Sequence, residues 1–272
     1  MILSRSLRWL VAGALLGSDP LAAQSVVFLH PDRPRCQAGQ TLSFRAHNRT
    51  EGAERRAWPG ATWCFVRGAG FQENLHDLAS APEEGGAVAL ALEHAGVNLV
   101  GVELPARMED VPAPRFSRFL RERVGLEDET PGDQDSVRVR RVESLKALVT
   151  VVGEGPVAGH SSMALSKTGQ AVEIRLLADP TTVTVGADVP VRTYVEGASC
   201  ASALVRARSL DHGVEVSFRT DPSGIGCFRL SRSGRWRVEF HQAVRLAEDA
   251  GADWLVRSAT LTFDAPGREE DR

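Results

Sequence analysis

The residues best suited to metal or acid–base chemistry in this sequence are seven histidines, scattered along the chain: His30, His47, His76, His94, His160, His212 and His241. None is spaced as H-x-x-x-H or H-E-x-x-H, the patterns that bring two ring nitrogens to one face of a helix. Most of them are therefore expected to be ordinary surface histidines.

His241 differs from the others because of the strand that precedes it. Apolar and polar residues alternate from Trp236 to Phe240, and this period of two points His241 outward at the end of a strand. In a hairpin that returns at Trp254, Asp253 would lie across from it. We therefore treat four residues as a candidate site for a divalent transition metal (Ni, Cu or Zn): His241, Asp253, Glu248 and Asp249. The competing interpretation is an acidic loop that only keeps the strand end solvated.

The four cysteines suggest structural disulfides rather than catalytic thiols. An even number of cysteines in an exported chain suggests disulfides, and three connectivities are possible. The pairs Cys36–Cys64 and Cys200–Cys227 keep each bridge within one half of the sequence. A zinc site made of all four lacks the usual close C-x2–4-C spacing.

No other pattern predicts catalysis. The stretch Gly159-His160-Ser161-Ser162-Met163 begins like the G-x-S-x-G elbow of serine hydrolases, but its fifth residue is Met and no strand–turn–helix pattern surrounds it. The small residues from Gly153 to Gly159 lack the Lys-Ser/Thr pair of a phosphate-binding loop. The sequence therefore predicts a protein that is not an enzyme.

The N-terminus and the composition indicate an exported globular protein. Residues 1–23 combine Arg5 and Arg8, an apolar stretch and the small residues Ala22-Ala23, as a secretory signal does. No later apolar run reaches the roughly 20 residues that span a bilayer. A net charge of −3 gives no electrostatic footprint for nucleic acid. We expect a periplasmic or secreted protein that does not span the membrane once the signal is removed.

Short alternating runs separated by turn residues predict a mainly β protein with two immunoglobulin-like β-sandwich domains. The expected organisation is a signal peptide at 1–23, an N-terminal domain at 24–152, a linker at 153–169, a C-terminal sandwich at 170–265 and a disordered tail at 266–272. One short helix is expected in the N-terminal domain, where apolar residues fall at i, i+3, i+4 and i+8: Phe116, Phe119, Leu120 and Val124. Pro114 suits its first turn and Gly125 its end.

Several segments occur in an order typical of one exported bacterial family. They are 95–104, 115–122, 125–126, 141–146, 172–174, 179–180, 220–224, 234–236, 253–254 and 259–263. On these residues the chain resembles the family labelled domain of unknown function 4198, formerly described as a nickel-uptake, NikM-like component. The resemblance implies a periplasmic, two-domain, β-rich protein linked to transition-metal handling, and His241 matches a family histidine. Ser25 and Phe28 stand where family members often have His and Trp.

Two functional hypotheses follow. The first is a non-enzymatic extracytoplasmic accessory or binding protein for a transition metal, with a metal-uptake transporter or an outer-membrane receptor as its partner. The second is a structural or adhesive surface β-sandwich module that binds a protein or a glycan. No cofactor other than a divalent metal is expected.

Overall fold

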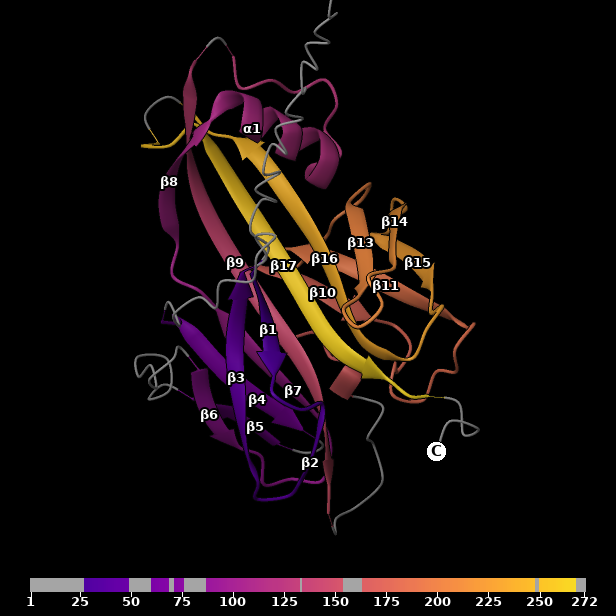
Figure 1. The fold of residues 1–272 in the computed structure, drawn as a ribbon. Helices are drawn as coiled ribbons and strands as arrows, with labels where there is room; N and C mark the ends of the chain where they lie inside the picture. Colours follow the sequence, from indigo (N-terminus) through magenta and orange to yellow (C-terminus); the bar gives the residue numbers. More distant parts are fainter. Residues whose placement is uncertain are drawn as a thin grey trace, which may run out of the picture.

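The computed structural model describes residues 27–48, 60–68, 71–75, 87–132, 134–153, 163–247 and 250–267 (Figure 1). The predicted signal segment lies outside the described residues. So do Glu248, Asp249 and most of the predicted tail.

The described chain is built almost entirely from strands, as predicted. They are β1 (Val27–Pro31), β2 (Arg35–Gln37), β3 (Thr41–Asn48), β4 (Trp63–Gly68), β5 (Phe71–Asn74), β6 (Ala87–Ala91), β7 (Gly96–Glu103), β8 (Arg107–Pro112), β9 (Ser136–Val152), β10 (Val172–Leu176), β11 (Asp188–Val195), β12 (Ala198–Ser199), β13 (Leu204–Ser209), β14 (Glu215–Arg219), β15 (Ile225–Arg229), β16 (Gly234–Arg245) and β17 (Trp254–Ala265).

A ten-stranded sheet forms the centre of the molecule. Its order is β14-β13-β16-β17-β9-β7-β4-β5, and β2 and β8 also pair with β9. The 17-residue β9 is long enough to take two neighbours on each edge. One edge pairs with β17 and β2, and the other with β8 and β7. The predicted hairpin is confirmed, because β16 and β17 pair antiparallel along their whole length.

Two smaller sheets pack on opposite faces of the large one. Consecutive residues of a strand point to opposite faces, and Ala147 and Leu148 of β9 accordingly enter different cores. The core on the Leu148 side is shared with the sheet of β10, β11, β12 and β15. The core on the Ala147 side is shared with the sheet β1-β3-β6. The fold is thus a β-sandwich with layers on both faces of the central sheet.

The predicted helix is confirmed in the first half of the chain. It consists of α1 (Ala113–Phe119) followed by one π-helical turn, η2 (Leu120–Val124), and it ends at Gly125 in the left-handed conformation (φ 80°). Its apolar stripe is buried against β8, the N-terminal part of β9 and Trp254. The helix therefore covers the end of the large sheet that the β1-β3-β6 sheet leaves free (Figure 1).

The large sheet is shared by both halves of the sequence. Strand β17 pairs in parallel with β9, from Trp254 opposite Val139 to Thr262 opposite Ala147. Of the predicted linker at 153–169, residues 154–162 lie outside the described chain. The division into two domains there stays a prediction.

Candidate functional site

Strand β16 has both faces buried, and this decides where His241 lies. Trp236, Val238 and Phe240 enter the core beneath the four-stranded sheet. Glu239, His241 and Ala243 point to the opposite face, where α1 and η2 lie. His241 is only 5% exposed and lies within the strand rather than outward at its end. The alternation was interpreted as one wet face, but the helix covers that face.

The imidazole of His241 is held between the sheet and the helix. Its Nδ1 lies 2.8 Å from the Ser258 hydroxyl, and its ring meets the Phe119 ring edge-on at 5.4 Å between centroids. Within the described chain, its Nε2 is buried without a hydrogen-bond partner. Burial lowers the pKa of His241 well below 6.5, and four nearby guanidinium groups lower it further: Arg123, Arg141, Arg237 and Arg206. The ring is therefore neutral near pH 7.

The structure does not bring the predicted metal ligands together. The residue opposite His241 is Ser258, whereas Asp253 precedes β17. Five residues of extended strand separate Asp253 from Ser258, a span of about 17 Å. Asp253 instead accepts a hydrogen bond of 2.7 Å from the Arg138 backbone N–H. Glu248 and Asp249 lie outside the described residues.

The surroundings of His241 do not fit a divalent cation. The four arginines that depress its pKa would also repel a metal ion, and Ser258 already occupies Nδ1. Nowhere in the described ranges do three or more His, Cys, Asp or Glu residues gather as a metal site would require. Of the predicted set, His241 and Asp253 lie within the described residues and are not brought together, while the role of Glu248 and Asp249 stays a prediction.

Ion pairs fasten the helix to this face of the sheet and join the neighbouring strands β8 and β9. Glu239 accepts a hydrogen bond of 2.9 Å from Arg123 of η2 and forms an ion pair of 2.7 Å with Arg237 of its own strand. Arg141 of β9 pairs with Glu109 of β8. These charges face the covering elements, so the charged residues that sequence patterns assign to solvent stabilise the layer contact instead.

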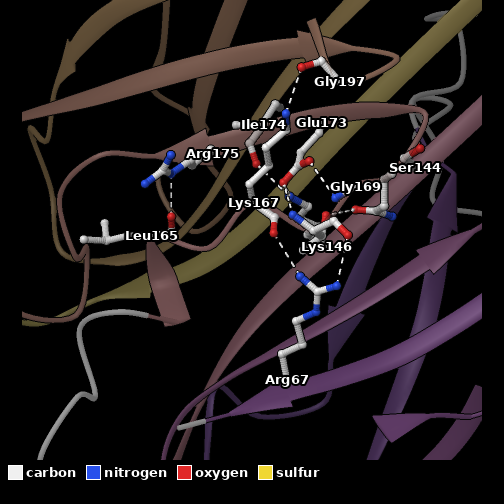
Figure 2. A network of polar contacts seen from close by, with 12 residues as sticks. Arg67, Ser144, Lys146, Leu165, Lys167, Gly169, Glu173, Ile174, Arg175 and Gly197 are labelled. Atoms are coloured by element: carbon white, nitrogen blue, oxygen red, sulfur yellow. Dashed lines mark hydrogen bonds and ion pairs between the residues drawn. The ribbon is translucent and has the colours of Figure 1, made fainter. Parts of the chain in front are cut away.

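A second buried ion pair joins the two halves of the chain. Lys146 Nζ of β9 lies 2.6 Å from Glu173 Oε1 of β10, and both side chains are at most 2% exposed (Figure 2). Lys146 also donates to the Ile174 carbonyl at 3.0 Å. Burial lowers the pKa of Lys146 from 10.5 to about 8, although Glu173 opposes this shift. Burial by itself would raise the pKa of Glu173, but Lys146 and two backbone N–H donors, from Thr168 and Gly169, lower it.

The segment that precedes β10 is held against the same pair. Arg67 of β4 donates to the carbonyls of Lys167 and Thr168 at 2.9 and 3.0 Å (Figure 2). Lys167 in turn donates to the Gly197 carbonyl at 2.8 Å. Sequence patterns did not reveal this network because its members are far apart in the chain. One signal was available: Lys146 and Lys167 are the only two lysines in a chain whose Lys and Arg total 32, and both belong to it.

Neither predicted disulfide is formed, and all four cysteines are free thiols. Cys36 lies opposite Val151 of β9, whereas Cys64 lies opposite Val102, which faces Leu145 of β9. Six residues of strand, about 20 Å, separate the two positions along β9. A bridge needs Cα atoms within about 7 Å. Closeness in sequence therefore did not predict closeness in this fold.

The second predicted pair also lies beyond bonding reach. The Cys200 N–H donates to the Thr193 carbonyl of β11, while Cys227 faces Pro190 of the same strand. The offset of three residues along β11 is about 10 Å. Cys200 is half-buried and Cys227 is exposed.

A small pocket of about 220 Å³ lies at the loop end of the β16–β17 hairpin. Asp253, Arg245 and Trp254 line it together with Gln134. Arg245 donates to the Thr130 carbonyl at 2.6 Å and stacks over the Trp254 ring. Because Arg245 and Asp253 already have partners in the protein, the pocket offers a ligand few uncommitted polar groups.

One part of the large sheet has a single covered face. Strand registers align Met108 of β8, Arg140 of β9, Leu255 of β17 and Val244 of β16 in one row. They point away from α1, on the side of the four-stranded sheet but beyond its end. Met108 and Val244 are 44% and 40% exposed, and Arg140 is also exposed. We call these four residues the open row.

Comparison with known proteins defines the class of the chain. The sequence profile described as "Domain of unknown function (DUF4198)" matches residues 105–243, more than half of the chain. The protein therefore belongs to that family, as its segment order predicted. No curated protein gives a match to the sequence. Within the described residues, neither helical segment has the length and apolar character to cross a membrane.

Solved structures share only a distant likeness with the chain. The D0–D1 domain of intimin is 12% identical, with 88% of this chain and 99% of that chain covered and a TM-score of 0.19. A segment of two fibronectin type III domains from chicken tenascin is 13% identical, with 79% and 89% covered and a TM-score of 0.21.

Proposed function

We propose that this member of the family is a non-enzymatic extracytoplasmic accessory protein that works by binding another protein, as a surface β-sandwich module does. The observation that carries the proposal is the open row, where one face of the large sheet presents apolar side chains to solvent. Apolar groups exposed side by side on a soluble protein mark interaction sites more often than isolated ones do.

The non-enzymatic part of the proposal is supported by how the chemically capable side chains are used. His241 lies beneath Phe119 and bonds to Ser258, and Lys146 bonds to Glu173 between two layers. A general base or nucleophile must reach its substrate within hydrogen-bond distance. These groups are instead committed to contacts between layers of the fold.

The extracytoplasmic part rests on the sequence of residues 1–23, which has the charged, apolar and small-residue regions of a secretory signal. An exported protein of this kind would meet its partner in the periplasm or at the cell surface.

A photo-reactive amino acid at Val244, introduced into the exported protein in its own cells, tests the proposal. Val216 of β14 is the matched control, because it is 37% exposed but lies outside the open row. We expect one discrete adduct from position 244 and none of the same mass from position 216. Its loss when Met108→Glu is added, with thermal unfolding unchanged, would support the row as the contact. No adduct at 244, or the same adduct from both positions, would overturn the proposal.

Transition-metal handling, with a metal transporter or outer-membrane receptor as partner, is the competing function. Calorimetric titration of the mature protein with Ni²⁺, Cu²⁺ and Zn²⁺, alongside His241→Ala, separates the two. We expect no heat that depends on His241. Stoichiometric binding that disappears in the variant would favour the metal function.

A further inference from the structure

We infer that the partner of the open row presents a carboxylate to Arg140, flanked by aliphatic side chains that cover Met108 on one side and Leu255 and Val244 on the other. This inference rests on the proposed function and specifies the chemistry of the partner.

Arg140 is the polar centre of an otherwise apolar row. The antiparallel register with β8 sets Met108 beside it, and the parallel register with β17 sets Leu255 on its other side. Among the described residues, no hydrogen bond or ion pair engages the Arg140 side chain, whereas Arg257, one step along the sheet, is paired with Glu196. The row therefore carries one uncommitted positive charge between apolar neighbours.

A partner that covers the Arg140 guanidinium must supply a hydrogen-bond acceptor for it. An apolar partner would bury the guanidinium without an acceptor, and an unpaired buried charge costs several kcal/mol. A carboxylate can accept two parallel N–H bonds from the planar guanidinium, which is also weakly hydrated and suited to interfaces. A partner surface that alternates aliphatic and acidic residues meets both requirements.

Other occupants fit the row less well. An anionic membrane attracts roughly 1 kcal/mol per basic residue, too little for one free arginine on a chain of net charge −3. A second copy docked about a two-fold axis through the row would bring two Arg140 side chains together. We therefore assign the row to a different protein.

The photo-adduct from position 244 provides the measurement. We expect the yield to fall roughly tenfold in Arg140→Gln, the equivalent of one lost charge-assisted contact, and below detection in Arg140→Glu. Arg140→Lys should retain an intermediate yield. Arg138→Glu is the control, because Arg138 is also exposed on β9 but lies outside the row; less than a twofold change is expected. Thermal unfolding of each variant confirms that the fold is kept.

The outcomes separate the inference from the function on which it rests. An adduct that persists in Arg140→Glu would overturn the carboxylate inference and leave the binding function standing. Equal losses in Arg138→Glu and Arg140→Glu would also overturn it, because they indicate a general field effect. The absence of any adduct in the parent protein would remove both proposals.

Discussion

Lys146 Nζ lies 2.6 Å from Glu173 Oε1, in a contact that joins the strand before residues 154–162 to the strand after them. The pair is buried from water, and the Lys146 ammonium group also donates a hydrogen bond to the Ile174 carbonyl. An ion pair in such a setting depends strongly on both members, because either one alone is a buried charge.

Removing one member should therefore cost more than removing both. We expect Lys146→Met to lower the free energy of unfolding by roughly 3–5 kcal/mol, and the double variant Lys146→Met/Glu173→Gln to recover a large part of it. Urea denaturation near pH 7 provides the measurement. A double variant less stable than the single one would contradict this account.

The same pair predicts how stability responds to alkaline pH. The pKa of Lys146 is lowered to about 8 in the folded state, so the unfolded state binds more protons between about pH 8 and 10.5. The contribution of Lys146 to stability therefore rises with pH across this window. The difference in free energy between the parent and the double variant isolates this contribution, because both proteins carry the same thiols. A difference that stays constant with pH would refute the prediction.

His241 determines how stability is expected to respond to acidic pH. Its folded pKa is depressed, so below pH 6.5 the unfolded state takes up a proton that the folded state does not. We therefore expect the free energy of unfolding to fall as the pH falls through this range, by up to about 1.4 kcal/mol per pH unit. His241→Gln, which keeps a polar group beside Ser258, should weaken this dependence. His212→Gln, at an exposed position, should leave it unchanged. Equal slopes for all three proteins would count against the prediction.

The sequence could predict elements whose cause is local. Alternation from Trp236 to Phe240 predicted β16, and the stripe from Phe116 to Val124 predicted the helix, because burial of one face sets each period. The pattern could not show that this helix would cover the second face of β16. His241 was consequently assigned to solvent and to a metal.

The parts of the site that sequence patterns could not predict depend on strand register and sheet topology. Lys146 and Glu173 are 27 residues apart, and no local period connects them. The open row needs three separate strand registers before Met108, Arg140 and Val244 become neighbours. The predicted cysteine pairs have the same limitation in their basis: they were inferred from closeness in sequence, whereas the positions of the cysteines along β9 and β11 decide which ones can meet.

The thiols give a direct chemical test of these registers. We expect the denatured mature protein to react at four thiols without prior reduction. In the folded protein Cys227 should react first because it is exposed. Cys64 should react last, because burial raises its pKa to about 11 and suppresses the thiolate. Timed alkylation followed by peptide mapping measures the order. Fewer than four thiols would instead support the disulfides that the sequence suggested.

The shared sheet predicts that the two halves fold together. A fragment ending at 153 would expose the edge of β9 that β17 covers, and a fragment starting at 163 would expose β17 and Glu173. We expect each fragment to be insoluble alone and the co-expressed pair to form a soluble complex. Two fragments that each unfold cooperatively alone would establish the independent domains at 24–152 and 170–265 instead.

Strand β17 is the last of the described strands in chain order, yet it lies between β16 and β9 in the interior of the large sheet. During synthesis, more than a hundred residues must therefore follow β9 before β17, one of its four neighbours, exists. Pairing over so long a loop is slow to form. A stop codon shortly before Trp254 would remove this interior strand, so it should be as damaging as a stop codon much earlier in the coding sequence.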